Sequence, residues 1–257
     1  MMCLVVCAVA LLASCLTFFS GFGLGTLLLP AFVLFFPVEQ AIAMTAVVHM
    51  LNGLFKLTLV GRHADRGVVL HFGVPAVLAA LLGALALSWL ADQAPVYRYT
   101  ALGHDLAIMP VKLAVGMVLL LFSLVELVPR LRDLSFNRSW MPLGGALSGF
   151  FGGLAGMQGA LRSAFLARAG LSKEVFIATG VVIAVLIDFS RIGIYAKEMA
   201  GVGGHLDYRL LTFAVLAAFL GAFIGNRTLR KMTMPAIQGI VAASLFLVAI
   251  ALIFGLL

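Results

Sequence analysis

Long apolar runs recur along the whole 257-residue chain, and short charged connections separate them. A transmembrane α-helix needs about 20 such residues to cross the hydrocarbon core of a bilayer. Runs near this length cover residues 41–60, 68–90, 111–128, 175–196, 210–226 and 235–257. With 63% hydrophobic and 11% charged residues, the chain has too little polar surface to cover a water-soluble globule. We therefore predict an all-α polytopic membrane protein without a soluble domain.

The net charge of +7 does not indicate a nucleic-acid partner, because most of the 17 Lys and Arg residues lie in the short connections. Membrane topology alone accounts for that placement. Cys3, Cys7 and Cys15 share the first apolar segment and lack metal-ligand spacing, so we expect packing residues, no metal and no cofactor. The first positive charge is Lys56, so a basic signal-peptide region is missing and a retained membrane segment is favoured.

Two further apolar regions, residues 1–38 and 141–169, are interrupted by glycines. The interruptions are Gly21, Gly23 and Gly25 in the first region and Gly149, Gly152, Gly153 and Gly156 in the second. Short motifs recur in the same order in both halves of the chain: Ser20-Gly21-Phe22 and Ser148-Gly149-Phe150, Thr45-Ala46-Val47-Val48 and Thr179-Gly180-Val181-Val182, His63-Ala64-Asp65 and His205-Leu206-Asp207, Leu82-Gly83-Ala84 and Leu220-Gly221-Ala222. This order predicts a duplication with repeats at 1–134 and 141–257, each a glycine-broken segment followed by three transmembrane helices.

The loop charges test how the two repeats are oriented. If each broken region crosses the membrane once, seven positive residues face each side. If each broken region instead returns to the face where it starts, ten positive residues share one side: Arg62, Arg66, Arg130, Arg132, Arg138, Arg168, Lys173, Arg227, Arg230 and Lys231. The four on the other side are Arg98, Lys112, Lys197 and Arg209. Ten against four satisfies the positive-inside rule, so we predict inverted repeats with the ten-charge face cytoplasmic and both termini outside.

Inverted repeats with paired broken helices are typical of secondary transporters, in which the breaks free backbone groups near the midplane to hold an ion. Helix amino termini at such breaks favour anions. The alternative is that the glycines only allow close helix packing. The chain has no Walker motif, G-x-S-x-G elbow or H-E-x-x-H pair, which argues against an ATP-driven pump or a membrane hydrolase.

A polar stripe marks the helix expected at residues 41–60. Thr45, His49, Asn52 and Lys56 are spaced by four, three and four residues and share one helix face. Exposing such charges to lipid costs several kcal/mol, so the stripe should face a bundle interior or a water-filled cavity. The alternatives are a neutral His49 bonded to a neighbouring helix and a Lys56 side chain that reaches the membrane interface.

The second half offers a further set of polar residues. Asp188 and Arg191 are three residues apart and can pair on one helix that also carries Thr179. Gln158 and Arg162 follow the second glycine break, and Arg162 could present its planar donors to an oxyanion or pair with Asp188 or Glu126. His49 and Asp188 are the titratable candidates for proton coupling.

Several motifs resemble the sulfite exporter TauE/SafE family of membrane transporters over nearly the whole chain. They are Gly21-Phe22-Gly23-Leu24-Gly25-Thr26-Leu27-Leu28-Leu29-Pro30, Ala43-Met44-Thr45, His63-Ala64-Asp65-Arg66, Leu82-Gly83-Ala84 and Gly221-Ala222-Phe223-Ile224-Gly225 with Arg227, Arg230 and Lys231. The resemblance implies transport of small sulfur-containing or organic anions, such as sulfite, thiosulfate and sulfonates, across a cytoplasmic membrane. The second break departs from the family's glycine-rich stretch ending in proline, since it reads Gly156-Met157-Gln158-Gly159-Ala160-Leu161-Arg162-Ser163.

We therefore expect a multi-pass transporter, not an enzyme, that moves small anions by alternating access of one repeat against the other. Its substrate-binding residues would be Thr45, His49, Asn52, Lys56, Gln158, Arg162, Thr179 and Arg191, beside backbone groups freed at Gly21, Gly23, Gly25, Gly153 and Gly156. The alternative is a membrane scaffold whose polar stripe binds another protein. An enclosed His49 and Lys56 would favour transport, whereas a lipid-facing stripe would favour a partner. A homodimer is left open.

Overall fold

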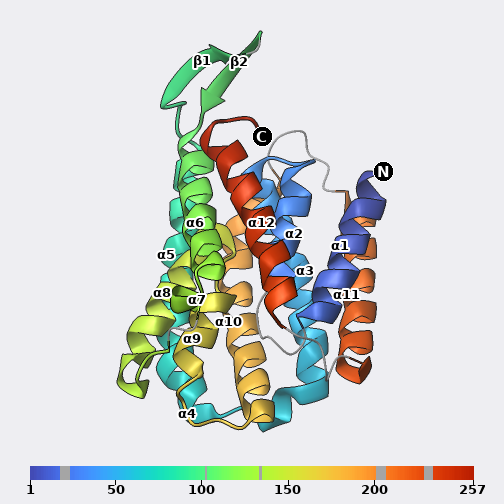
Figure 1. Cartoon of the computed structure of the whole chain (residues 1–257), viewed down its shortest axis with the longest axis vertical. Coiled ribbons are helices and arrows are strands. Elements are labelled where there is room, and N and C mark those ends of the chain that lie inside the picture. Colours follow the sequence, from blue (N-terminus) through green and yellow to red (C-terminus); the bar gives the residue numbers. More distant parts are fainter. Residues whose placement is uncertain (18–23, 102, 133–134, 201–206, 229–233) are drawn as a thin grey trace.

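The computed structural model describes residues 1–17, 24–101, 103–132, 135–200, 207–228 and 234–257, which form a helical bundle (Figure 1). The helices are α1 (Met2–Leu16), α2 (Leu24–Val33), α3 (Val38–Val60), α4 (Arg66–Val68), α5 (Val74–Ala91), α6 (Pro110–Leu127), α7 (Pro129–Arg132), α8 (Met141–Ala155), α9 (Gly159–Leu166), α10 (Lys173–Ala200), α11 (Tyr208–Thr228) and α12 (Met234–Ile253). A π-helical turn, Val69–Gly73, joins α4 to α5, and 3-10 turns lie at Gly61–His63 and Arg138–Trp140.

Five helices in the described part of the chain are long and apolar enough to cross a membrane. They are Val38–His63, Arg66–Ala91, Pro110–Leu127, Lys173–Ala196 and Tyr208–Arg227. These helices coincide with the first five predicted runs. The sixth run coincides with α12, of which Val241–Ile253 is a shorter apolar helix. The prediction of a helical polytopic membrane protein is confirmed.

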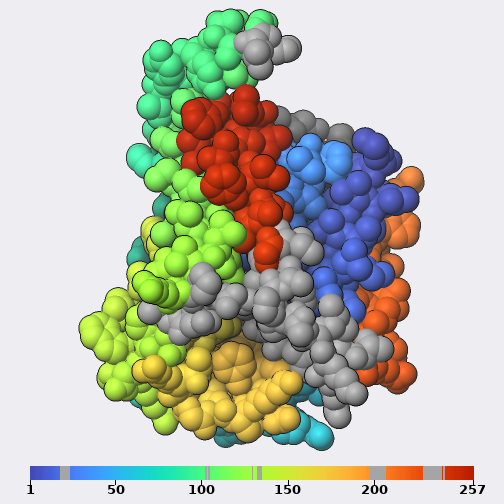
Figure 2. Space-filling view, viewed as in Figure 1, coloured from blue at the N-terminus to red at the C-terminus, as the bar shows by residue number. Residues whose placement is uncertain are grey.

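A small β-hairpin is the one described element that the helical prediction does not include. Strands β1 (Tyr97–Ala101) and β2 (His104–Ile108) pair antiparallel with Tyr97 opposite Ile108. The hairpin projects beyond the helices at the end of the bundle that carries both termini (Figures 1 and 2). The Tyr99 hydroxyl donates to the Phe254 carbonyl at 2.6 Å and holds the hairpin to the carboxyl terminus. We call this end the hairpin end and the opposite one the α4 end.

The second broken region is a helical hairpin. A Cβ built on Gly144 would lie 2.3 Å from the Phe165 ring, and one on Gly152 would lie 3.0 Å from the Gln158 Cβ, so α8 and α9 run antiparallel. The chain therefore returns to the end from which it started, as the charge count requires. Gly149, Gly152 and Gly153 lie inside α8, and the helix ends only at Gly156, whose φ of +75° favours glycine.

The glycines inside α8 have a packing role. Cβ atoms built on Gly145, Gly149 and Gly153 would lie 2.2, 2.0 and 2.1 Å from the carbonyl oxygens of Phe72, Ala76 and Ala80. Because both series rise by four residues, α8 lies parallel to the helix of α5 with the two backbones in contact. Such small-residue faces are how helices associate closely in lipid.

An equivalent contact joins α1 and α11. Cβ atoms on Gly221 and Gly225 would lie 2.2 and 2.5 Å from the carbonyl oxygens of Leu11 and Cys15, so these helices are also parallel. The broken region of each predicted repeat thus packs its first helix on a helix of the other repeat.

The helix directions are those that an inverted duplication requires. His49 meets Asp188 and Gly53 meets Val185, so α3 and α10 run antiparallel. α1 starts at the hairpin end and α5 at the α4 end, so α11, which is parallel to α1, runs against α5 (Figure 1). The duplication, its bounds at 1–134 and 141–257 and the cytoplasmic position of the α4 end stay predictions.

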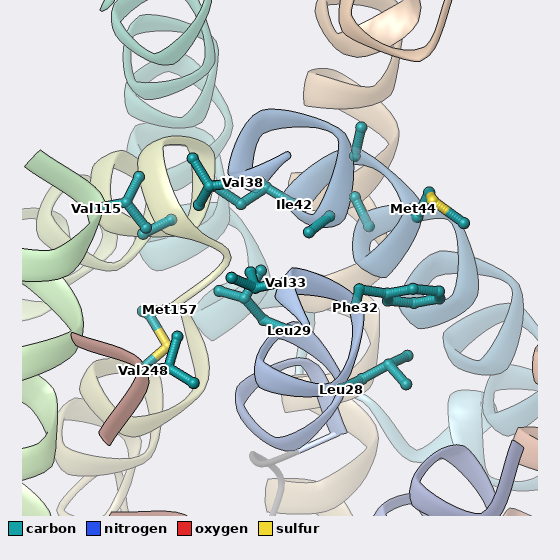
Figure 3. Close-up of a cluster of buried hydrophobic side chains, with 14 of the residues drawn as sticks. Leu28, Leu29, Phe32, Val33, Val38, Ile42, Met44, Val115, Met157 and Val248 are labelled. Atoms are coloured by element: carbon teal, nitrogen blue, oxygen red, sulfur yellow. The ribbon is translucent and has the colours of Figure 1, made fainter. Parts of the chain in front are cut away.

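Buried apolar side chains hold α2 and the turn after α8 against their neighbours. Side chains of α2, α3, α6, α12 and the turn after α8 gather in one cluster that includes Leu28, Phe32, Ile42, Val115, Met157 and Val248 (Figure 3). Met157, in the turn between α8 and α9, belongs to this cluster and lies beside Val248 of α12 (Figure 3).

The α5–α8 contact predicts the effect of one added methyl group. Gly149→Ala should destabilise the protein by about 1–3 kcal/mol, because the methyl overlaps the Ala76 carbonyl and forces the helices apart. Gly193→Ala is the matched control, since among the described residues no atom of a neighbouring element lies within 4 Å of a Cβ there. The thermal midpoint of the detergent-solubilised protein measures the effect, and equal midpoints for the two variants would contradict the close contact.

Candidate functional site

Asp188 of α10 is fully buried and is the centre of a polar network. Its Oδ2 lies 2.5 Å from His49 Nδ1 of α3. Its Oδ1 accepts hydrogen bonds from Gln158 Nε2 at 2.9 Å and from Arg191 Nη2 at 2.7 Å. One carboxylate thus joins α3, α10 and the connection between α8 and α9.

The burial of Asp188 explains why its partners are needed. An ionised carboxylate in a membrane interior is costly unless charged or hydrogen-bonding groups surround it. Both carboxylate oxygens of Asp188 have such partners. The contact with Asp188 occupies His49 Nδ1 and thereby fixes the orientation of the imidazole ring.

Arg191 and Tyr195 hold the end of α8. Arg191 Nη1 donates to the Gly152 carbonyl, and the Tyr195 hydroxyl donates to the Gly153 carbonyl. The last carbonyl groups of a helix lack partners within it, and a positive side chain near this end also complements the helix dipole. The Gly153 carbonyl, predicted to be free at the break, therefore accepts a hydrogen bond from Tyr195 of α10. Arg191 donates both to Asp188 and to the Gly152 carbonyl near the break.

Arg162 reaches Asp188 through Gln158. Arg162 is 3% exposed, and its Nη1 donates to Gln158 Oε1 at 3.0 Å, while Gln158 donates to Asp188. The Ser148 hydroxyl donates to the Gln158 carbonyl at 2.7 Å and fixes this residue at the turn. Lys56 of α3 is also buried, seven residues after His49 on the same helix face.

The start of α2 meets the turn between α8 and α9 beside Thr45, and the predicted break residue Gly25 lies inside α2. A Cβ on Gly25 would lie 3.5 Å from the Gly156 carbonyl oxygen, 3.7 Å from His49 Cδ2 and 3.8 Å from Thr45 Cγ2. The predicted break residues Gly21 and Gly23 lie outside the described residues.

Two predicted site residues have other partners. Asn52 Oδ1 accepts a hydrogen bond from Ser14 of α1 at 3.2 Å. Thr179 Oγ1 accepts one from the Asp65 amide at 2.9 Å, at the start of α4. Thr179 precedes Asp188 by nine residues, or about 13 Å along the helix. The structure therefore brings His49, Gln158, Arg162 and Arg191 together around Asp188, but it does not bring Thr179 there.

The polar stripe of α3 faces the inside of the bundle. Thr45, Asn52 and Lys56 are buried, and the His49 side chain is 18% exposed. Tyr195 was missing from the predicted site, although it extends the Asp188 and Arg191 face of α10 by one turn. That spacing, which mirrors the stripe on α3, is the sequence signal that identifies it.

One comparison with known proteins gives a match. A family model described as "Sulfite exporter TauE/SafE" matches residues 6–252, which include the second broken region, all but the first five residues of the first, and every residue of the Asp188 network. No curated protein and no solved structure matches the chain.

The Asp188–Arg191 pair predicts coupled effects on stability. Asp188→Asn should cost about 3–5 kcal/mol, because it leaves Arg191 buried without its carboxylate. The Asp188→Asn/Arg191→Met double variant should lose less unfolding free energy than the two single variants lose in total. The expected difference is about 0.5–3 kcal/mol. The control combines Asp188→Asn with Arg168→Met, because Arg168 is exposed. In this double variant the losses of unfolding free energy should be additive. Unfolding free energies of the variants in detergent test this, and additivity for both pairs would contradict the ion pair.

Proposed function

This chain belongs to the sulfite exporter TauE/SafE family, and on that premise we propose that it is a secondary transporter of small sulfur-containing anions. Sulfite, thiosulfate or an organosulfonate would cross the cytoplasmic membrane by alternating access. The observation that carries the proposal is the Asp188 network, a charged cluster enclosed among membrane-spanning helices at the turn between α8 and α9.

The enclosed position of the cluster supports transport over a scaffold role. Charged side chains inside a membrane are costly, and they mark substrate or ion pathways. A stripe that bound another protein's helix would face outward, whereas Thr45, Asn52 and Lys56 are buried within this chain. The buried stripe therefore supports a role for the cluster within one copy of the protein rather than in binding a partner.

The anion would bind on the side of the network formed by Arg162, Lys56 and the start of α9. A guanidinium offers a planar set of donors that matches an oxyanion, and a helix amino terminus adds backbone donors and a favourable dipole. Gln158 orients Arg162 through the hydrogen bond at 3.0 Å. We assign Arg191 to holding the break, because its donors serve Asp188 and Gly152.

The His49–Asp188 contact supports coupling to protons. A histidine can take up or release a proton, and its charge decides how strongly it attracts the Asp188 carboxylate. The two residues lie on α3 and α10, so protonation would change the link between these helices. A proton and an anion would then act on one network.

The packing favours moving units that mix the predicted repeats. α1 is in backbone contact with α11, and α5 with α8, although each pair combines helices from both repeats. Sliding one repeat past the other would separate both contacts. We therefore propose that the α1–α11 pair moves against the α5–α8 pair, with the α3–α10 contact as the boundary.

Neutralising Arg162 tests the anion site. Arg162→Ala should abolish saturable sulfite and sulfonate flux in proteoliposomes without stopping membrane insertion, because it removes the fork of donors. Arg168→Ala is the matched control, since Arg168 is exposed in the connection after α9. Normal flux through a well-folded Arg162→Ala protein would contradict the assignment of Arg162 to the anion site.

Spin labels test the moving units. In a cysteine-free variant, labels at Leu85 of α5 and Leu143 of α8, both exposed, should keep one distance distribution when sulfite is added. Labels at Leu85 and exposed Leu216 of α11 should change theirs. Pulsed electron paramagnetic resonance gives both distributions. A change in both pairs would instead indicate that the repeats move as units, because each pair joins residues of different repeats.

A further inference from the structure

The hairpin end of the bundle contains a cavity of about 520 Å³. Its walls come from the connection between α2 and α3 (residues 33–37 and 39), the last residue of α5, the start of α6 and Leu257. Leu34 in this wall is 56% exposed, so the cavity is open at the surface. Charged residues at the ends of membrane helices mark the boundary with water. Glu39 and Lys112 therefore place the cavity at that boundary.

Two helices lead from the cavity to the Asp188 network. α2 ends in the cavity wall at Val33, and a Cβ built on Gly25, eight residues earlier, would lie 3.7 Å from His49 Cδ2. α3 begins in the wall, where Glu39 precedes His49 by ten residues. At a rise of about 1.5 Å per residue, these stretches measure about 12 and 15 Å. The cavity and the network thus lie at opposite ends of the same two helix segments.

An apolar layer separates the cavity from the network. Its side chains, which are all buried and belong to one cluster, include Val33, Ile42, Val115 and Met157 (Figure 3). Val33 lines the cavity, whereas Met157 directly precedes Gln158 of the network. Apolar constrictions keep out water and ions until they widen. In this structure the route from the hairpin end to the network is therefore closed.

The cavity is suited to passage rather than to tight binding. A water molecule occupies about 30 Å³ in the liquid, so the cavity has room for a small anion together with its nearest water molecules. Most of its wall is apolar and includes Phe35 and Phe36, and the charges of Glu39 and Lys112 have opposite signs. Such a wall neither traps an anion nor repels it strongly.

We propose that this cavity is the outer entrance of the anion pathway. The inference rests on the proposed transport function, to which it adds a route. An anion enters or leaves between the α2–α3 connection and the start of α6, and it reaches the Asp188 network when the apolar layer widens during alternating access.

The sign of a charge placed in the cavity tests this route. In a cysteine-free variant, Leu34→Cys is labelled in detergent with a small maleimide that carries either a sulfonate or a trimethylammonium group, and the protein is then reconstituted. At low salt, sulfite uptake should be about three to ten times slower with the negative adduct than with the positive one, because the negative adduct repels the anion at the entrance. The difference should shrink at high salt, because ions screen the added charge.

Tyr97→Cys on the β-hairpin is the matched control. Tyr97 is 62% exposed at the same end of the bundle but does not line the cavity, so the two adducts should give equal uptake there. Lys112→Cys repeats the comparison from the α6 wall of the cavity. Thermal midpoints show that the labelled proteins remain folded.

Reactivity of Val115→Cys tests the closed layer. Val115 is fully buried, so this cysteine should stay unlabelled under conditions that label Leu34→Cys completely. Complete labelling of both cysteines would contradict a closed layer between the cavity and the network.

The uptake measurements separate the outcomes. An effect of charge sign at Leu34 and Lys112, but not at Tyr97, supports the entrance. Equal uptake with both adducts in the cavity, or the same difference at Tyr97, overturns it and leaves the anion transporter in place. If the unlabelled wild type takes up no tested anion, the proposed function fails and the entrance fails with it.

Discussion

The burial of the Asp188 carboxylate is the constraint around which the inside of this bundle is organised. A charge of this kind inside a membrane must be surrounded by donors, and here they come from α3, α10 and the turn between α8 and α9. The same requirement places Gln158 at the turn and Arg191 against the end of α8. A single acidic residue thus determines where the second break lies relative to the polar stripe of α3.

Glycine faces make this arrangement sterically accessible. The α5–α8 and α1–α11 contacts bring backbones together without side chains between them, which packs the first helix of each broken region against a full-length span. Close packing of this kind is how helices associate in lipid, where apolar surface alone gives no preference for another helix. In the second broken region, α8 continues through Gly149, Gly152 and Gly153, and the helix is interrupted only at Gly156.

Local patterns predicted the spans and much of the site. Apolar runs located the membrane helices, and the spacing of Thr45, His49 and Lys56 indicated an inward face, because helix periodicity is a property of the sequence. The sequence could not predict which residues on different helices form hydrogen bonds with one another. That Thr179 bonds Asp65 rather than the network, and that Gln158 bridges Arg162 to Asp188, depends on how α10 meets its neighbours. The β-hairpin was missed because short polar connections carry little periodic signal.

Uptake of radiolabelled sulfite by proteoliposomes that contain the wild-type protein, with and without an imposed pH gradient, tests the central claim most directly. Protein-free liposomes give the background, and unlabelled sulfite, thiosulfate and a sulfonate serve as competitors. The Asp188 network predicts saturable uptake that exceeds the background, responds to the pH gradient and is inhibited by at least one competitor. Uptake of no tested anion above the background, by protein shown to be folded, would contradict an anion transporter and favour a scaffold.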